Sequence, residues 1–404
     1  LSGWFVALII LLAFSGGVFW WIHSGLYAAL NSVLALLIVS CPCALALAAP
    51  VALSVGVRKA ARLGVYIRGS ETIEKLASAE TIFLDKTGTI TEGKMTVQEA
   101  ICLLPGGDVV DFPEADAGLQ RKIAEAVCLL ERHSPHPAAA ALIEYLRPSA
   151  AVLPEGWQTE EITGKGVRAH DAHGLEWRIG SWPWVKEQIS LPAAQFDAAA
   201  SAYAGQGLTP AALGHDGAVY ALFALGDPVR EGMRQAVQEL RQDGRRCVIL
   251  SGDDVQVVRS VALRLNIDEA DIYAGLSPEE KTEIVIRANK QEMCAMTGDG
   301  LNDAGALQAA SVAIGVSGGA EACLKIAQVF LSRPDAGNLA LAFLGSRAVI
   351  RVIKLNFAIS IIYNMCGAGL ALCGLMNPLL AAVLMPLSSI SVVISSVFGR
   401  TYFR

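Results

Sequence analysis

The chain has 404 residues, of which 53% are hydrophobic and only 17% are charged, and its mean hydropathy is +0.45. These values exclude a disordered protein and an ordinary soluble enzyme, and they indicate a membrane protein. The formal net charge of −6 provides no global basic field, so nucleic acid is not expected as a partner. Nine cysteines without regular spacing argue against a disulfide framework and favour a reducing compartment.

Two long stretches of the sequence lack charged residues. Residues 1–57 contain no Asp, Glu, Lys or Arg, and His23-Ser24-Gly25 divides them into two spans of about 20 residues or more. Residues 355–399 are also without charge and break near Asn377-Pro378, which predicts two more spans. We therefore expect four membrane-spanning helices. Because the chain opens inside apolar sequence without Met, we interpret it as a fragment of a longer protein.

Basic residues flank both apolar stretches, at positions 58, 59, 62 and 68 after the first and at 347, 351 and 354 before the second. The positive-inside rule therefore places residues 58–354 in the cytosol. This segment is long enough for two domains. Its short apolar runs, such as Thr81–Leu84 and Val248–Leu250, alternate with amphipathic stretches. That pattern is typical of a parallel sheet with crossover helices.

Asp85 directly follows the apolar run Thr81–Leu84, which places its carboxylate at the carboxyl end of a predicted strand. Open α/β sheets bind ligands at this edge. A carboxylate there can attack phosphorus and form an aspartyl phosphate. The small residues in Lys86-Thr87-Gly88-Thr89 would let backbone N–H groups approach phosphate oxygens.

The string Asp85-Lys86-Thr87-Gly88-Thr89 matches in full the phosphorylation motif of P-type ATPases, which the chain resembles along nearly its whole length. The string 297–303 is similar to the family's second phosphate and magnesium motif, and 227–230 falls where the family has a hinge motif. The resemblance implies that Asp85 is the nucleophile and that Asp85, Asp299 and the Thr87 carbonyl hold Mg²⁺. It places the following further residues at the phosphoryl site: Lys86, Thr89, Ser251, Gly252, Asp253, Lys281, Thr297, Asn302 and Asp303. Gly305 stands where the family usually has Pro.

The resemblance also implies a domain organisation: four spans plus a Rossmann-like, haloacid-dehalogenase-type phosphorylation domain with an inserted α+β nucleotide-binding domain. The expected segments are a transmembrane pair at 1–57, a linker and the first part of the phosphorylation domain at 58–95, the nucleotide-binding domain at 96–220, the second part of the phosphorylation domain at 221–335, and a linker with the second transmembrane pair at 336–404. The family's actuator motif Thr-Gly-Glu does not occur in the sequence. We therefore interpret the chain as the carboxyl-terminal part of a pump that lacks its actuator domain and is not competent for full turnover.

The inserted segment carries a distinctive string around two histidines. His133 and His136 could form a metal pair, but the prolines on both sides of His136 disfavour the helix that this would need. The string resembles instead the His-Pro signature of heavy-metal P-type ATPases, which implies that His136 contacts adenine and that Glu131 assists. By the same resemblance, glycines let the backbone lie close to ATP, and these are Gly164, Gly166 and Gly180. Ser181 stands where the family has Asn.

Cys41-Pro42-Cys43 lies within the second apolar span. A proline inside a helix frees a carbonyl, and two thiols beside it would converge on that opening. Buried cysteine is otherwise commonly inert, which is how we interpret Cys366 and Cys373. The motif resembles the heavy-metal subfamily. Similarity to its copper(I)-type members adds the following residues of the last two spans: Tyr363, Asn364, Met385 and Ser389.

Thiolate and thioether ligands favour Cu⁺, whereas harder divalent ions prefer carboxylate or imidazole, and neither uncharged stretch contains Asp or Glu. The sequence therefore predicts ATP-driven export of Cu⁺, or Ag⁺, through an aspartyl phosphate, with ATP and Mg²⁺ as cofactors. We expect a monomer in the lipid bilayer of a bacterial plasma membrane, supplied by a copper chaperone. The alternatives are a zinc, cadmium or lead pump, a membrane-anchored aspartate-nucleophile phosphatase, and a non-catalytic metal-binding membrane protein.

Overall fold

The structure is a computed structural model and describes residues 2–41, 43–147, 158–162, 165–171, 174–189, 194–300, 303–316, 321–333 and 336–399. The chain divides into two compact units. Residues 1–80, 327–333 and 337–404 form the helical unit, and residues 81–326 and 334–336 form the sheet unit.

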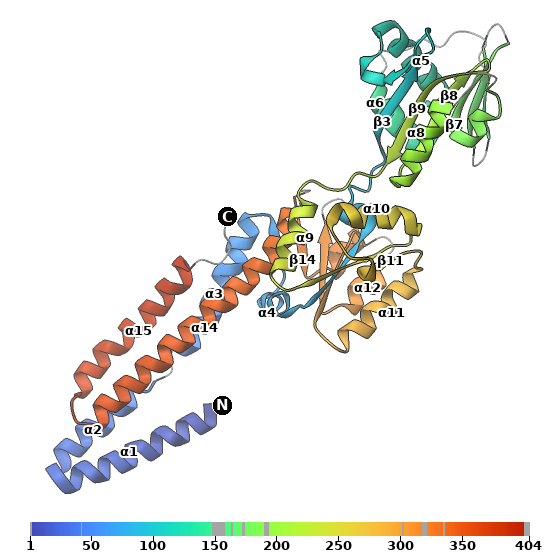
Figure 1. Cartoon of the computed structure of the whole chain (residues 1–404). Coiled ribbons are helices and arrows are strands. Elements are labelled where there is room, and N and C mark those ends of the chain that lie inside the picture. Colours follow the sequence, from blue (N-terminus) through green and yellow to red (C-terminus); the bar gives the residue numbers. More distant parts are fainter. Residues whose placement is uncertain are drawn as a thin grey trace. The chain divides into compact units, whose positions relative to one another are not determined.

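The helical unit is dominated by five helices, α1 (Ser2–Ser24), α2 (Leu26–Val39), α3 (Cys43–Arg62), α14 (Gly337–Leu372) and α15 (Pro378–Phe398) (Figure 1). It also contains α4 (Glu71–Ser78) and the antiparallel pair of β1 (Val65–Ile67) and β14 (Val329–Leu331). Among the described residues, three helices are long and apolar enough to cross a membrane, namely α1, α14 and α15.

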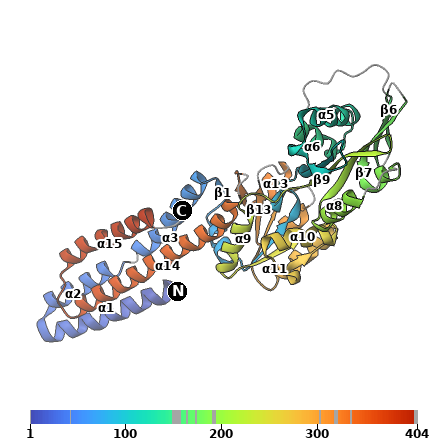
Figure 2. The ribbon, with the colours of Figure 1, turned by 45° about the horizontal axis from the view of Figure 1, so that its top comes forward.

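The second predicted span is interrupted, because α2 ends at Val39 and α3 begins only at Cys43. A proline at position 42 explains a break here, since it cannot donate a backbone hydrogen bond and its ring clashes with the preceding turn. Small residues such as Ala35 and Ala371 pack α2 closely against α14. Figure 2 shows α14 and α15 running side by side.

The first sheet of the sheet unit is parallel, as the sequence predicts. Within this unit its strands run in the order β13 (Val312–Val316), β12 (Cys294–Gly298), β2 (Thr81–Asp85), β10 (Arg246–Leu250) and β11 (Ile272–Tyr273). The connections contain α9 (Met233–Gln242), α10 (Val255–Leu265), α11 (Pro278–Asn289), α12 (Ala304–Ala309) and α13 (Glu321–Ile326). Every residue of β2 is buried, because the strand lies in the middle of the sheet.

The second sheet is antiparallel. Its strands run in the order β4 (Val109–Asp111), β3 (Thr96–Leu103), β9 (Ala218–Gly226), β8 (Thr209–His215), β7 (Glu176–Ser181), β6 (Gly166–His170) and β5 (Gln158–Ile162). Alternate strand residues point to opposite faces, so that Leu213 and Ala212 belong to different cores. One face is covered by α5 (Ala117–Glu131) and α6 (Pro137–Leu146), and the other by α7 (Trp182–Lys186) and α8 (Ala194–Gly205).

Candidate active site and metal site

Three neighbouring strands of the parallel sheet end at the candidate phosphoryl site. Asp85 is the last residue of β2 and pairs in register with Leu250 of β10. Ser251 follows β10, and Asp299 follows β12 on the other side of β2. The parallel arrangement therefore brings these separate sequence motifs to one edge, where such sheets bind ligands.

Lys281 lies between two carboxylates of this edge. Its Nζ donates hydrogen bonds to Asp85 Oδ1 at 2.7 Å and to Asp303 Oδ1 at 2.8 Å. Lys281 lies in the first turn of α11, and a capping box between Ser277 and Glu280 stabilises the start of this helix. All three members of the cluster are at least 95% buried. A buried ammonium that contacts a candidate nucleophile can also compensate the charge of a bound phosphate.

The buried charges at this edge shift one another's pKa values. Burial raises the pKa of Asp85 to about 7, with Asp303 and Asp299 adding to the shift and Lys281 opposing it. Burial alone would lower the pKa of Lys281, but Asp85 and Asp303 raise it overall, so the lysine stays charged. The ammonium of Lys281 therefore contacts two carboxylates, those of Asp85 and Asp303.

Residues after Asp85 form an irregular turn, η1 (Lys86–Ile90), in which Gly88 has a φ of 71°. Lys86 forms an ion pair of 2.7 Å with Asp253, whose carboxylate also accepts a hydrogen bond from Ser251 Oγ at 3.0 Å. Burial alone would raise the pKa of Asp253, but the Lys86 contact lowers it overall. These contacts join the two loops after β2 and β10. They leave Lys281 as the ammonium that contacts Asp85.

Two residues of the expected hinge motif hold this turn, although we did not place them at the site from the sequence. Arg230 donates from Nη2 to the Gly88 carbonyl at 2.7 Å and from Nε to the Thr91 carbonyl at 3.0 Å. Asp227 accepts from the Gly93 backbone N–H at 2.9 Å. The sequence marked both residues only as members of the hinge motif at 227–230, and their contacts with the segment after Asp85 are visible only in the structure.

The donor set fits a phosphate and a hard divalent cation. A Cβ built on Gly88 would lie 3.1 Å from Asp299 Oδ2, so the Asp299 carboxylate lies against the turn that follows Asp85. The Thr89 and Thr297 hydroxyls are buried without a hydrogen-bond partner among the described residues. Carboxylate and carbonyl oxygens suit Mg²⁺. Among the residues that the structure covers, no group of three His, Cys, Asp or Glu side chains is arranged to hold a metal by itself. Asn302 lies outside the described residues.

The antiparallel sheet carries a cavity of about 260 Å³ that contains most of the predicted nucleotide residues. Glu131, His136, Gly166 and Gly180 line it, whereas Gly164 lies outside the described residues. Glu131 is 7% exposed, and burial raises its pKa to about 7. Lys165, within the glycine motif, also lines the cavity, as do Glu161 and Thr209, which we did not predict from the sequence.

His136 caps α6 and is exposed at the cavity. Its Nδ1 accepts a hydrogen bond from the Ala138 backbone N–H at 3.1 Å. A ring nitrogen that accepts a hydrogen bond carries no proton, so the proton of the neutral ring is on Nε2. That nitrogen can donate a hydrogen bond to a ligand in the cavity. The cap thus fixes both the position and the tautomer of the imidazole.

Gly166 and Gly180 face each other across β6 and β7. A Cβ built on Gly166 would lie 2.1 Å from the Ile179 carbonyl oxygen, and one on Gly180 would lie 2.1 Å from the Lys165 carbonyl oxygen. No side chain fits at these distances. The sheet itself therefore requires both glycines, besides any contact with a nucleotide.

The helical unit holds the predicted metal-site residues on three segments. Cys41 follows α2, and it is disulfide-bonded in this structure, which differs from the expected free thiol. The side chain of Cys43 lies outside the described residues. The remaining predicted ligands are all half-buried, with Tyr363 and Asn364 on α14 and Met385 and Ser389 on α15.

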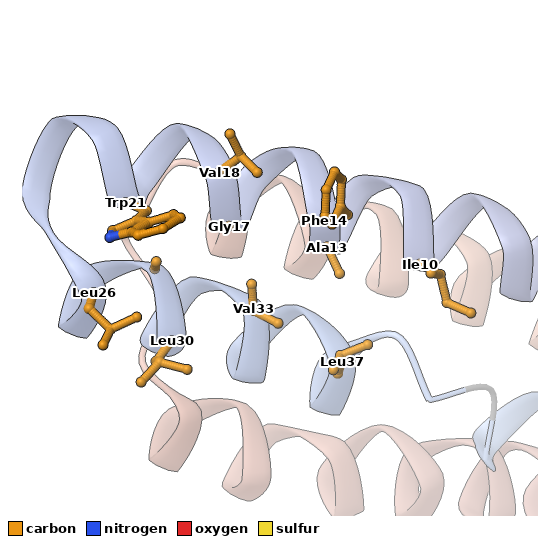
Figure 3. A pocket seen from close by; sticks show the side chains of 11 residues that line it. Ile10, Ala13, Phe14, Gly17, Val18, Trp21, Leu26, Leu30, Val33 and Leu37 are labelled. Atoms are coloured by element: carbon orange, nitrogen blue, oxygen red, sulfur yellow. The ribbon is translucent and has the colours of Figure 1, made fainter.

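A second cavity, of about 490 Å³, lies between α1 and α2 (Figure 3). Its lining residues are hydrophobic or glycine and include Phe14, Trp21 and Leu30. With no charged or sulfur-bearing side chain in the lining, it is suited neither to a metal ion nor to a nucleotide.

A family model of haloacid dehalogenase-like hydrolases matches residues 79–311, and the chain belongs to this family. The region includes Asp85, Lys281 and Asp299 and excludes the five long helices of the helical unit.

Relatives extend the match over nearly the whole chain. A silver-exporting P-type ATPase of Salmonella typhimurium is 34% identical over 98% of this chain and 47% of its own length. A copper-exporting P-type ATPase of Legionella pneumophila is 33% identical over 98% of this chain and 53% of its own length. The chain is therefore similar to heavy-metal P-type ATPases along nearly its whole length, and it spans about half the length of these relatives.

A solved structure gives the same result. A zinc-transporting PIB-type ATPase in the E2.Pi state superposes with a TM-score of 0.77 and 26% identity, over 97% of this chain and 62% of that chain. The match includes the helical unit, so the chain has the architecture of an integral membrane protein.

Proposed function

We propose that the complete protein exports Cu⁺, and Ag⁺, from the cytosol with energy from ATP and with phospho-Asp85 as the intermediate. The observation that carries this proposal is the buried contact of Asp85 with Lys281 at the carboxyl end of β2. An aspartate at this position can accept the γ-phosphoryl group. Lys281 would compensate the charge of that group, and the turn held by Arg230 would position it.

Asp85, Asp299 and the Thr87 carbonyl are the groups that would hold Mg²⁺, which would neutralise charge on the transferred phosphate. Lys86, Thr89, Thr297, Asn302, Asp303 and the 251–253 loop would shape the site around it. In the cavity of the antiparallel-sheet domain, His136 would donate a hydrogen bond from Nε2 to the adenine base. Glu131 lines the same cavity, and its raised pKa of about 7 means that pH decides whether its carboxyl group is protonated. Gly164, Gly166 and Gly180 would provide the close backbone surface.

The metal path would run through the helical unit. Cys41 and Cys43, once reduced, would bind Cu⁺ with Met385, while Tyr363, Asn364 and Ser389 complete the surroundings. We propose that the interrupted α2 and α3 together make the second predicted span, which with α1, α14 and α15 would give four. The predicted domain limits, the cytosolic location of residues 58–354, a bacterial plasma membrane, a monomer and delivery by a copper chaperone are parts of the same proposal.

Zinc export is the second candidate, because the solved relative named above transports zinc. Against it, no Asp or Glu occurs between residues 1 and 70 or between 337 and 399. Zinc would have to be held without carboxylate ligands from these segments, which suits it less than Cu⁺.

The experiment compares metal-stimulated ATP hydrolysis by the complete protein under reducing conditions. We expect Cu⁺ and Ag⁺ to stimulate more than Zn²⁺, and Cys41→Ser and Met385→Leu each to reduce the stimulation by about tenfold or more, because each removes a soft ligand. Cys373→Ser is the matched control, since this thiol is free and exposed. Greater stimulation by Zn²⁺ than by Cu⁺ would favour the second candidate.

A further inference from the structure

One hydrogen bond and one close approach mark the register of α14 against α15. Asn356 Nδ2 donates a hydrogen bond of 3.0 Å to Ser396 Oγ, and both residues are 0% exposed. Nearer the carboxyl end of α15, a Cβ built on Gly399 would lie 3.1 Å from a methyl of Val352. From the first pair to the second, the position on α14 goes back by four residues, from Asn356 to Val352, and the position on α15 goes forward by three, from Ser396 to Gly399. This is the relation expected of antiparallel neighbouring helices.

Two of the proposed metal-site residues on these helices, Tyr363 and Ser389, lie about two turns from the hydrogen bond. Tyr363 follows Asn356 by seven residues on α14, and Ser389 precedes Ser396 by seven residues on α15. Seven residues make about two helical turns, so each ligand lies on the same face as its partner and about 10 Å along the axis. Pro386 precedes Ser389, and no proline interrupts the helix between Ser389 and Ser396. Because the helices are antiparallel, the hydrogen bond therefore places Tyr363 and Ser389 at the same height along the helix pair.

Asn356 also begins a stripe of residues along one face of α14. Ser360 and Tyr363 follow it at spacings of four and three residues, and Gly367 follows four residues later. The stripe ends against α2, because a Cβ on Gly367 would lie 2.4 Å from Val39, two residues before Cys41. The same face of α14 thus contacts α15 at one end and the segment leading to Cys41 at the other.

This interface leaves polar atoms unpaired. Asn356 Oδ1, Ser360 Oγ and Tyr363 Oη are buried without hydrogen-bond partners among the described residues. Unpaired buried polar atoms cost free energy, so an apolar pair at 356 and 396 would hold the helices together at least as well. Helix stability alone therefore does not account for an Asn and a Ser at these two positions.

We propose that Asn356 and Ser396 form a positioning pair that sets the register of α14 and α15, so that Tyr363 and Ser389 meet the same transported ion. Neither residue contacts the ion, and each acts through the residue two turns away on its own helix. The inference rests on the proposed function, because it takes Tyr363 and Ser389 as part of the metal site.

The test measures Ag⁺ affinity of the complete protein under reducing conditions by competition with a chelator. The Ag⁺ binding of a Cys41→Ser, Cys43→Ser double variant is subtracted from that of each protein, and the difference is the binding at the membrane site. Asn356→Leu and Ser396→Ala should each lower the affinity about tenfold, and the pair together should cost about as much as either alone, because both remove one interaction. The unfolding midpoint of the paired variant should be unchanged or higher.

Two controls accompany these variants. Ser396→Thr keeps the hydroxyl and should bind Ag⁺ like wild type. Ser391→Ala, on the exposed side of α15, removes a hydroxyl that bonds back to the Ser388 carbonyl and should also bind normally.

Wild-type affinity in the paired variant would overturn the positioning role. A loss of affinity accompanied by an equal loss of stability would also overturn it, because it would show a merely structural contact. If wild type binds no more Ag⁺ than the cysteine double variant, the proposed function itself fails, and the inference falls with it.

Discussion

Lys281 and Asp85 form an ion pair of 2.7 Å in which each side chain is only 7% exposed. The same ammonium lies 2.8 Å from Asp303, so a single cation compensates two buried carboxylates. Removing one partner of such a cluster leaves the other charges buried without compensation, which destabilises the fold. The same ion pair therefore affects both the stability of the sheet unit and the candidate nucleophile.

Lys281→Gln should therefore lower the free energy of unfolding by about 3 kcal/mol and abolish phosphorylation, because two carboxylates lose their counter-charge. Urea unfolding and phosphoenzyme assays measure the two effects. Lys290→Gln, at the exposed end of the same helix, should change neither. Unaltered stability in Lys281→Gln would be inconsistent with the buried cluster.

The pH dependence of stability should report on Glu131, whose pKa burial raises from 4.5 to about 7. Between these values the folded state keeps a proton that the unfolded state has released, so stability should fall as pH rises through this range and level off above it. Glu131→Gln keeps a neutral side chain and should raise the free energy of unfolding at pH 8 by on the order of 1 kcal/mol. Glu187→Gln, at an exposed position, should retain the wild-type profile. Identical profiles for Glu131→Gln and wild type would show that Glu131 is charged at neutral pH.

Gly166→Ala should destabilise the antiparallel sheet by about 3 kcal/mol or more, because its Cβ would lie 2.1 Å from the Ile179 carbonyl oxygen and the strands must separate. Thermal unfolding and ATP binding measure the effect. Gly205→Ala, where a Cβ meets nothing within 4 Å, is the control and should be neutral or slightly stabilising. A folded Gly166→Ala protein with normal stability would rule out this close pairing.

His136→Ala should weaken ATP binding about tenfold, because it removes both the α6 cap and the Nε2 donor. Phosphorylation by inorganic phosphate should be spared, since that reaction needs no adenine contact. His133→Ala is the matched control, because His133 does not line the cavity. Equal ATP affinity in His136→Ala and wild type would remove His136 from the nucleotide site.

Local patterns in the sequence predicted where Asp85 lies in the fold. A carboxylate directly after an apolar run is enough to place Asp85 at the end of a strand, and the parallel sheet then brings Ser251 and Asp299 beside it. The apolar stretches likewise predicted α14 and α15, because length and composition decide whether a helix can span.

Contacts between distant residues could not be predicted in the same way. The pairing of Gly166 with Gly180 depends on the register of two strands, and the Asn356–Ser396 hydrogen bond depends on how two helices pack. Neither register is encoded within one short segment. The break between α2 and α3 was partly visible, because Pro42 was recognised as an opening in the helix but not as its end.

The most direct test of the account is acid-stable labelling of the complete protein by ATP radiolabelled in its γ-phosphate, with Cu⁺ or Zn²⁺ under reducing conditions. The account predicts Cu⁺-dependent label in wild type and none in Asp85→Asn, which keeps the size of the side chain but removes the nucleophile. Label at the wild-type level in Asp85→Asn, or more label with Zn²⁺ than with Cu⁺, would contradict it.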